Sequence, residues 1–389
     1  MWRSALLVLV AWAAGAGVLR ATVIEAEVCP PLTAADARAA AVRSAEWMER
    51  AQYSDGTYLY EYDRDTDALS LEYNVVRHAG VTMSLYQFAA VGEPRFLPVA
   101  DRGLGYMEAN LLRGEGWAAF LDPGSERVAL GANALLLAGL AQRRIATGDA
   151  SRDGLMAEVA GFLVKLQRTD GSFLAEWDRA TGAPVPGITS KYATGEAFWA
   201  LALMHRLFPG GGWDVPSRLV ATYLATARDD VEGFDFPPWA DQWAAYGLAE
   251  MARWPVDDRQ AVYARSLAER FGFLIRVESR RRTTWFSDLL HGRQARAAGL
   301  GTWVEGLGSL WALAGVDPRL ADLKTDIGRR AICGAGMLAS RQVAPGEDLG
   351  ARPGVLLGAW FTEGKTRMDD QQHALSGLLL AERILEAPR

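Results

Sequence analysis

The sequence predicts an all-α protein, an (α/α)6 toroid in which six helical hairpins close into a ring. Three observations lead to this prediction. Twelve segments of helical periodicity alternate with loops along the 389 residues, and no strand-type alternation of polar and apolar residues is sustained for long. A polar residue followed by a small one recurs near the start of every second segment. These second segments are apolar nearly all round, as expected of helices covered on every side.

The chain opens with a segment, residues 1–28, that has the features of an export signal or a membrane anchor. Arg3 precedes an apolar run from Ser4 to Leu19. Ala14-Gly15-Ala16 offers small residues for cleavage, yet an uncleaved inner-membrane anchor fits the same run. We therefore expect an exported protein, periplasmic or extracellular or anchored to the inner membrane. Residues 29–389 are expected to form a single toroid domain.

Six pairs of segments follow, each with helical spacing of its apolar residues. In the first pair, 34–51 and 74–91, Thr33 is a plausible N-cap before Asp36. The later pairs are 96–112 with 127–147, 152–168 with 190–207, 216–228 with 240–254, 257–277 with 300–314, and 317–341 with 368–386. The connection inside each pair is long, whereas the connection between pairs is usually a short turn with Gly or Pro. All long loops then lie on one face, where helix N-termini favour anionic groups.

The second segments share one register. Their polar-to-small steps are His78-Ala79, Asn133-Ala134, Glu196-Ala197, Trp243-Ala244, Glu305-Gly306 and His373-Ala374. Successive steps lie 55, 63, 47, 62 and 68 residues apart. This period suits a helical hairpin and is too long for common solenoid repeats. In a closed ring the sixth of these helices lies beside both the fifth and the first.

Charge and composition narrow the classes of partner. The formal net charge is −6, with acidic and basic residues mixed along the chain, so there is no basic field to attract a nucleic acid. We expect no nucleic-acid partner. Cys29 and Cys333 can pair in an oxidising compartment and tie the N-terminal arm to the last third of the chain, or remain two inert thiols.

One segment is similar to a known repeat. Residues 162–173, FLVKLQRTDGSF, resemble the Gln-Trp type repeat of squalene cyclases and related α/α toroids, and Trp47-Met48, Gln52 and Asp55-Gly56-Thr57-Tyr58 repeat the pattern. Toroidal polysaccharide lyases and six-hairpin glycosidases share it, so the resemblance implies the architecture and selects no activity. Arg367 stands where the Asp-x-Asp-Asp motif of protonating terpenoid cyclases has its first Asp, which disfavours isoprenoid chemistry.

Polar residues at the closing seam of the ring predict a catalytic site. Ring closure makes Glu305, His373 and His78 spatial neighbours. Carboxylates beside imidazoles can act as general acid and base, because crowding and burial raise one carboxyl pKa while an arginine keeps another group ionised. The alternative is that the surrounding residues cap helices and close an ion pair across the seam. These surrounding residues are Asp369, Asp370, Asn74 and Arg77.

A second cluster is predicted across the ring. Glu196 is its catalytic candidate, and its neighbours can either bind substrate or form an ion-pair network that fixes the loop mouth. The neighbours are Lys191, Tyr192, Asp241 and Gln242. Tryptophans in the long loops are candidate sugar-stacking platforms, with packing at the rim as the alternative. Those named as substrate-binding are Trp177, Trp239 and Trp360.

The candidate residues imply a function class. They lack the short His or Cys spacings of a zinc site, and the chain has no phosphate-cradling glycine loop and no nucleophile elbow, so we predict no metal and no cofactor. Zinc bound by His78, His373 and either Glu305 or Asp369 is the alternative. The predicted function is an exported carbohydrate-acting enzyme, a glycoside hydrolase, lyase or epimerase that uses general acid/base catalysis on a glycan. The alternatives are a non-catalytic glycan- or protein-binding toroid of an envelope complex and an isoprenoid-acting toroid.

Overall fold

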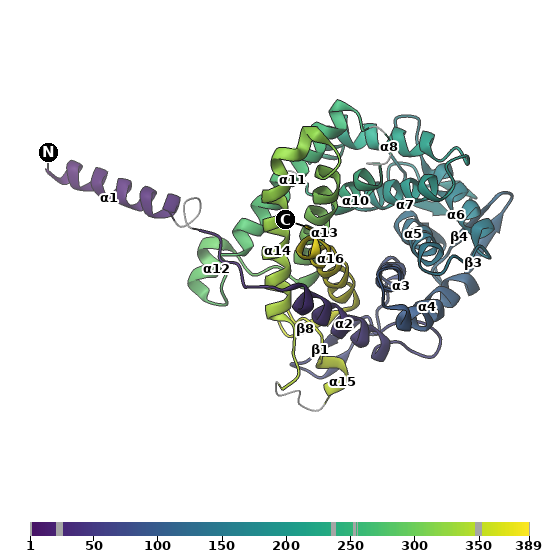
Figure 1. Cartoon of the computed structure of the whole chain (residues 1–389), viewed down its shortest axis with the longest axis horizontal. Coiled ribbons are helices and arrows are strands. Elements are labelled where there is room, and N and C mark those ends of the chain that lie inside the picture. Colours follow the sequence, from purple (N-terminus) through teal and green to yellow (C-terminus); the bar gives the residue numbers. More distant parts are fainter. Residues whose placement is uncertain are drawn as a thin grey trace.

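The computed structural model describes residues 2–20, 26–234, 239–251, 254, 256–346 and 352–388. Within them, two concentric layers of helices form a ring (Figure 1). The inner helices are α3 (Val75–Ala90), α5 (Leu130–Thr147), α7 (Ala193–Leu207), α10 (Gln242–Met251), α13 (Ala297–Ala314) and α16 (Met368–Glu386). The outer helices are α2 (Ala34–Arg50), α4 (Leu97–Ala109), α6 (Asp153–Leu166), α8 (Asp214–Thr226), α11 (Asp258–Glu278) and α14 (Lys324–Arg341).

The ring closes between α16 and α3. Each inner helix contacts the next along the chain, and α16 contacts both α13 and α3. Two glycines face α16 at these contacts. A Cβ on Gly301 of α13 would lie 2.5 Å from the carbonyl carbon of His373, and one on Gly80 of α3 would lie 2.3 Å from the side-chain oxygen of Gln372. At Gly301 the neighbour is backbone, so a larger residue there would block closure, whereas at Gly80 the neighbour is the end of the Gln372 side chain. The predicted (α/α)6 toroid is confirmed.

The predicted hairpins match the observed helices closely. Helix ends agree within three residues, except that the segment predicted at 317–341 begins as a 3-10 helix, η3 (Pro318–Leu323), before α14. Thr33 caps α2 as expected and accepts a hydrogen bond from the Asp36 amide. Helix α12 (Trp285–His291), between α11 and α13, is not predicted. The segment predicted at 240–254 includes residues 252 and 253, which lie outside the described residues.

Short strands join the long loops on one face of the ring. The strand β1 (Glu61–Asp63) pairs antiparallel with β2 (Ala68–Leu69) and with β8 (Lys365–Arg367), so the first and last hairpins are also joined through their loops. The other pairs are β3 (Leu111–Gly114) with β4 (Trp117–Phe120), and β6 (Glu176–Asp178) with β5 (Arg127–Ala129) and β7 (Ala183–Pro184). The remaining helices are η2 (Pro94–Phe96), α9 (Arg228–Glu232) and α15 (Pro353–Leu356).

The repeated Gln-Asp-Gly turn fastens one hairpin to the next. The side-chain amides of Gln52 and Gln167 each donate, at 2.9 Å, to a backbone carbonyl in the first turn of the next outer helix. Gly56 and Gly171 adopt φ values of +92° and +93° in the same turns, and a Cβ on either would lie 2.3 Å from a carbonyl oxygen of that helix. Only glycine permits both the left-handed conformation and the close approach. The motif therefore stabilises the contact between one hairpin and the next.

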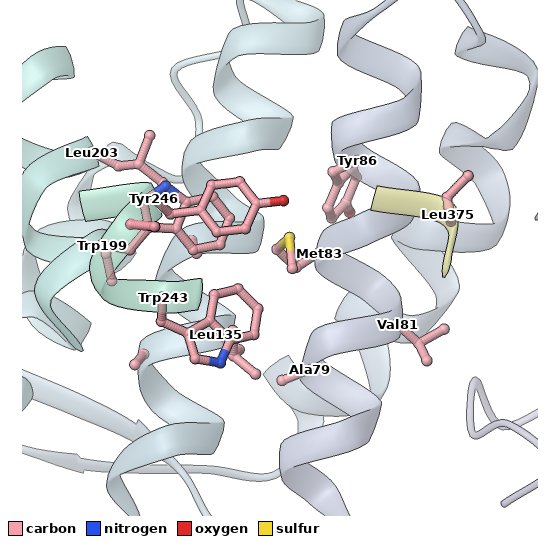
Figure 2. Packing of buried hydrophobic residues seen from close by; sticks show 14 of the residues in the cluster. Ala79, Val81, Met83, Tyr86, Leu135, Trp199, Leu203, Trp243, Tyr246 and Leu375 are labelled. Atoms are coloured by element: carbon pink, nitrogen blue, oxygen red, sulfur yellow. The ribbon is translucent and has the colours of Figure 1, made fainter. Parts of the chain in front are cut away.

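The inside of the ring is filled with side chains below the inner-helix N-termini. Trp199 of α7 stacks with Trp243 and Tyr246 of α10, with ring centroids 5.5 and 4.6 Å apart. Figure 2 shows Met83 of α3 next to the ring of Tyr246, and Leu135 of α5 near Trp243. All five side chains are buried in one core. The aromatic stack lies directly below polar residues at the inner-helix N-termini, among them Glu196 and His373.

The N-terminal segment is fastened to the outer wall. The helix α1 (Trp2–Leu19) has no buried residue, and among the described helices it is the one long and apolar enough to cross a membrane. Cys29 and Cys333 form a disulfide, the paired alternative of the two that the sequence allows. Glu27 adds ion pairs with Arg329 of α14 at 2.7 Å and Arg276 of α11 at 3.7 Å.

Removing the disulfide is expected to lower the free energy of unfolding. The bond links positions 304 residues apart, so it restricts the unfolded chain strongly. The double variant Cys29→Ser, Cys333→Ser should lose about 2–5 kcal/mol. Urea unfolding under oxidising conditions measures the loss, with the reduced parent protein as the control, which should unfold like the variant. Equal midpoints for variant and oxidised parent would contradict this prediction.

Candidate active site

His373 and Glu305 form a pair inside the ring. The Nδ1 atom of His373 lies 2.8 Å from Oε2 of Glu305. The Glu305 side chain is fully buried, whereas that of His373 is 13% exposed. The hydroxyl of Tyr246 donates to the other Glu305 oxygen at 3.4 Å, and the Trp243 ring lies 5.8 Å from the imidazole. Glu305 therefore orients the imidazole and occupies Nδ1, which leaves Nε2 to exchange protons with a bound molecule.

Charges around this pair shift both pKa values. Burial lowers the pKa of His373, but the negative charge of Glu305 and its hydrogen bond outweigh burial, so the pKa is raised above its ordinary value. The charge of Asp369 adds to this rise, and so does Glu196 in its ionised form. Burial raises the pKa of Glu305, and His373 opposes that rise. The imidazole is thus positioned among acidic side chains of its own helix, α16, of α13 and of α7.

Glu196 of α7 is the second buried acid at this site. Burial raises its pKa to about 8, the charge of Asp241 adds to the rise, and the charge of His373 opposes it. Gly131 of α5 makes room for the carboxyl group, since a Cβ there would lie 2.4 Å from Glu196 Oε2. Glu196 is therefore a neutral carboxylic acid at pH 7, able to donate a proton or a hydrogen bond.

Asp369 and Arg77 close an ion pair across the α16–α3 seam. Arg77 Nε lies 3.0 Å from Asp369 Oδ2, and Arg77 also contacts the hydroxyl of Tyr60. Arg367 Nε approaches the other oxygen, Oδ1, at 3.3 Å. That contact lacks hydrogen-bond geometry, so among the described residues Oδ1 accepts no hydrogen bond. Asp369 is held as part of a charged pair, and its Oδ1 is a buried acceptor without a hydrogen bond from the described residues.

Two of the candidate residues at the seam act as caps. Asp370 pairs with Arg296 at 2.6 Å and accepts hydrogen bonds from the backbone amides of Ala298 and Arg367, both at 3.0 Å. It therefore joins the first turns of α13 and α16. Asn74 caps α3 by accepting from the Arg77 amide at 3.0 Å. For both residues the geometry matches the capping alternative.

His78 lies on the other side of α3, against α4. Its Nδ1 is 2.6 Å from the Tyr73 hydroxyl, and its Nε2 is 2.9 Å from the carbonyl oxygen of Gly103. Burial lowers its pKa to about 4. The expectation that His78 meets His373 is wrong, because the His78 ring faces Gly103 of α4, while Gly80 and Arg77 are among the residues of α3 that face α16. His78 is a neutral histidine whose two ring nitrogens are both hydrogen-bonded within the protein wall.

The second predicted cluster also contains residues with structural roles. The side chain of Asp241 is fully buried, pairs with the equally buried Arg228, and accepts hydrogen bonds from the amides of Trp243 and Ala244 at 2.9 and 3.1 Å. It is the N-cap of α10 and one half of a buried ion pair. Gln242 is buried in the first turn of α10. The ion-pair network expected as the alternative is thus present, with Arg228 in the place proposed for Lys191.

The three tryptophans have different surroundings. Trp239 lies beneath Lys191, whose Nζ is 4.1 Å from the ring centroid, and beside Tyr192, which is 46% exposed. Trp177 is buried against Trp117 and other rings of the outer wall. Trp360 is buried and donates to the carbonyl of Leu338 at 2.8 Å. Trp177 and Trp360 therefore pack at the rim, while Trp239 supports an exposed aromatic residue.

The structure brings four predicted catalytic residues together and adds one that sequence reasoning misses. Glu305 is hydrogen-bonded to His373, and Asp369 and Glu196 are near enough to raise the pKa of that imidazole. Tyr246 completes the chain of hydrogen bonds behind Glu305. Its sequence signal is its position one turn after the polar-to-small step at Trp243.

The cluster is separate from a cavity on the outer side of the ring. A cavity of about 690 Å³ is lined by the N-terminal segment, α11 and α14, and not by the residues of the cluster. Within the described residues, no three His, Cys, Asp or Glu side chains are grouped so that they could hold a metal ion.

Comparisons with known proteins agree on the fold. No family model and no curated protein matches the chain. Among solved structures, a cellobiose 2-epimerase from Spirochaeta thermophila has a TM-score of 0.61 at 14% identity, over 90% of this chain and 97% of that one. An unsaturated glucuronyl hydrolase specific for heparin has a TM-score of 0.60 at 12% identity, over 90% and 98%. An α-mannanase from Bacteroides thetaiotaomicron has 0.59 at 9%, over 89% and 96%. The chain therefore has the (α/α)6 toroid fold of the six-hairpin glycosidase-like proteins.

Proposed function

We propose that this protein is a carbohydrate-acting enzyme that works by general acid/base catalysis. The observation that carries the proposal is the meeting of His373, Glu196 and Asp369 at the N-terminal ends of inner helices, with His373 held by a buried carboxylate. Groups whose pKa values are displaced in this way are typical of proton-transfer sites. The solved structures of the same fold support a sugar as substrate, because their names include an epimerase of cellobiose and an α-mannanase.

The reaction that this geometry favours is epimerisation or isomerisation of a sugar next to its carbonyl carbon. Nε2 of His373 takes the proton from the carbon, and the electron pair of the broken C–H bond moves to the carbonyl oxygen as an enolate. Glu305 stabilises the imidazolium that forms. Glu196, as a neutral acid, donates a hydrogen bond to the oxygen that gains negative charge. Return of a proton to the opposite face of the same carbon gives the epimer. Return to the neighbouring carbon, with a proton passed from the hydroxyl on that carbon to the former carbonyl oxygen, gives the isomer.

Hydrolysis of a glycosidic bond is the second candidate, and Asp369 is the observation that favours it. Its Oδ1 accepts no hydrogen bond from the described residues, although Arg77 and Arg367 hold the carboxylate in place. Asp369 could accept a proton from water while Glu196 protonates the leaving oxygen, the two-carboxylate scheme of glycosidases. His373 would then position the substrate.

One set of incubations distinguishes these reactions. The purified protein is incubated in D2O with a panel of reducing disaccharides and polysaccharides, followed by proton NMR and a reducing-end assay. Epimerisation or isomerisation gives a new sugar with deuterium at carbon. Hydrolysis gives new reducing ends without that exchange, and elimination gives an unsaturated uronate. Folded protein that binds a glycan and changes none would contradict the proposal and favour a non-catalytic glycan-binding toroid.

We also infer that the protein is exported and that α1 directs it to the membrane. Two features support this: the exposed apolar helix α1 and the disulfide between Cys29 and Cys333, a bond that persists in oxidising compartments. Fractionation of producing cells, with alkylation of free thiols, tests it. Recovery in the cytosolic fraction with two free thiols would contradict export.

The pH profile of the reaction should report Glu196. Its acid form is present below about pH 8 and is lost as the pH rises through that value, so the rate should fall on the alkaline side. Glu196→Gln cannot titrate and should lower kcat/KM by roughly 10²-fold or more and remove this alkaline limb. Glu158→Gln, at an exposed ion pair with Arg113, is the matched control and should keep the parent profile. An unchanged alkaline limb in Glu196→Gln would exclude Glu196 as the acid.

A further inference from the structure

The short helix α12 presents an exposed apolar face. Trp285, Phe286 and Leu289 are 77%, 57% and 73% exposed. Ser287 of the same helix is buried and accepts a hydrogen bond from the Arg282 amide at 2.8 Å, so the helix has a defined inner side. Three large apolar side chains within five positions are therefore directed to water by an ordered helix. Clustered exposure of this kind is typical of an interaction surface, whereas single exposed residues are ordinary.

The segment around α12 is strongly basic, in contrast to the rest of the chain. Residues 279–296 contain five arginines and one aspartate, so their formal charge is 5 − 1 = +4, while the whole chain has a net charge of −6. Arg282 is exposed and donates to the carbonyl oxygens of Ser279 and Arg281. Three other arginines of the segment pair with acids outside it, Arg281 with Glu278, Arg293 with Glu363 and Arg296 with Asp370. Arg282 is therefore the exposed cation that the segment contributes next to the apolar face of α12.

The position of α12 excludes a role as a lid over the candidate active site. Figure 1 shows α12 outside the ring, on the side from which α1 projects, and away from the ring centre. The contacts of the N-terminal segment agree with this view. Glu27 pairs with Arg276 in the last turn of α11, which leads directly into α12, and the Cys29–Cys333 disulfide holds the same segment to α14. The apolar helix α1 and the short helix α12 therefore lie on the same side of the ring.

We propose that α12 docks on an anionic lipid bilayer, with Trp285, Phe286 and Leu289 inserted at the level of the headgroups. Aromatic side chains favour the membrane–water interface, and arginines are attracted to the negative surface of anionic lipids. The exposed aromatic side chains of α12 meet the first requirement, and the exposed Arg282 meets the second. The continuity with α1, the helix that can enter a membrane, argues for a bilayer as the occupant and not a soluble partner. Two contacts with one bilayer would fix the orientation of the toroid, which α1 alone would not.

Site-directed labelling of the full chain tests this docking. Phe286→Cys is labelled with an environment-sensitive fluorophore under oxidising conditions, which leave the native disulfide intact, and mixed with phosphatidylcholine–phosphatidylglycerol vesicles that carry a nitroxide lipid. Val262→Cys is the matched control, because Val262 is 65% exposed near the opposite end of α11. The label at 286 should be quenched roughly three-fold or more strongly than the label at 262, and raised salt should weaken this quenching. Adding Trp285→Ser and Leu289→Ser, both at exposed positions, should bring the quenching at 286 down to that at 262.

Two results would overturn the proposal. Equal quenching at 286 and 262 would show that α1 alone contacts the bilayer. A blue shift of the 286 label that grows with protein concentration in the absence of vesicles would show that a second copy of the chain covers α12. Neither result bears on the proposed acid/base chemistry, since α12 contributes no residue to the candidate active site.

Discussion

Replacing His373 with Ala or Gln is expected to lower kcat/KM by roughly 10²–10⁴-fold, the usual effect of removing a general acid or base. Both variants remove Nε2 as a proton carrier, and Gln can still donate a hydrogen bond to Glu305, so its fold should be retained. The measurement is kcat/KM on the substrate found in the panel, together with a urea unfolding midpoint for each variant.

The control for this prediction is His205→Ala. His205 lies at the C-terminal end of α7, with its ring 3.9 Å from that of Trp254 and no contact with the candidate active site, so activity should be close to that of the parent. Restored activity in His373→Gln, with loss confined to His373→Ala, would show that His373 only supports the structure.

The variant Asp241→Asn is expected to lose about 3–5 kcal/mol of unfolding free energy, because it removes one of the two carboxylates, those of Asp241 and Glu232, that pair with the buried guanidinium of Arg228. The side chains of Asp241 and Arg228 are fully buried, and Asp241 also caps α10. Urea unfolding measures the loss. Asp322→Asn, at the exposed pair with Arg265, should change stability by less than about 1 kcal/mol. Equal losses in the two variants would contradict the assignment of Asp241 as a buried structural group.

The architecture could be predicted because its determinants are local and repeated. Each hairpin has its own helical periodicity, and the Gln-Asp-Gly turns at Gln52 and Gln167 make the same contact with the next outer helix. Ring closure followed from helices that are apolar on every side, and the glycines at Gly80 and Gly301 supply its physical basis. Because these signals lie within one hairpin or between neighbours, a single sequence contains them.

The candidate active site was only partly predictable, because it depends on how each helix is rotated about its axis. The polar-to-small step locates the start of an inner helix but does not say which side faces the ring centre. His373 and Glu196 face inward, whereas His78 at the same register faces α4. Asp370 and Asp369 are adjacent in sequence, yet one is saturated as a cap and the other has a free acceptor.

Helix α12 was missed for a different reason. Its seven residues are too few for a periodic pattern, and the preceding run of arginines reads as a solvated loop. Its helical form depends on the Thr284 cap, which accepts a hydrogen bond from the Ser287 amide, and on the buried Ser287 hydroxyl. Such a short element is specified by a few side-chain contacts that the sequence pattern alone does not reveal.

The most direct test of the proposed proton-transfer site is an NMR titration of the histidine side chains. The chain has four His, so each signal can be assigned by substitution. The pKa of His373 should lie above 6.5 in the parent and fall in Glu305→Gln, whereas His78 should remain neutral until about pH 4. Titration of His373 at or below 6.5, or a value that Glu305→Gln leaves unchanged, would contradict the account of a carboxylate-held imidazole as the centre of this site.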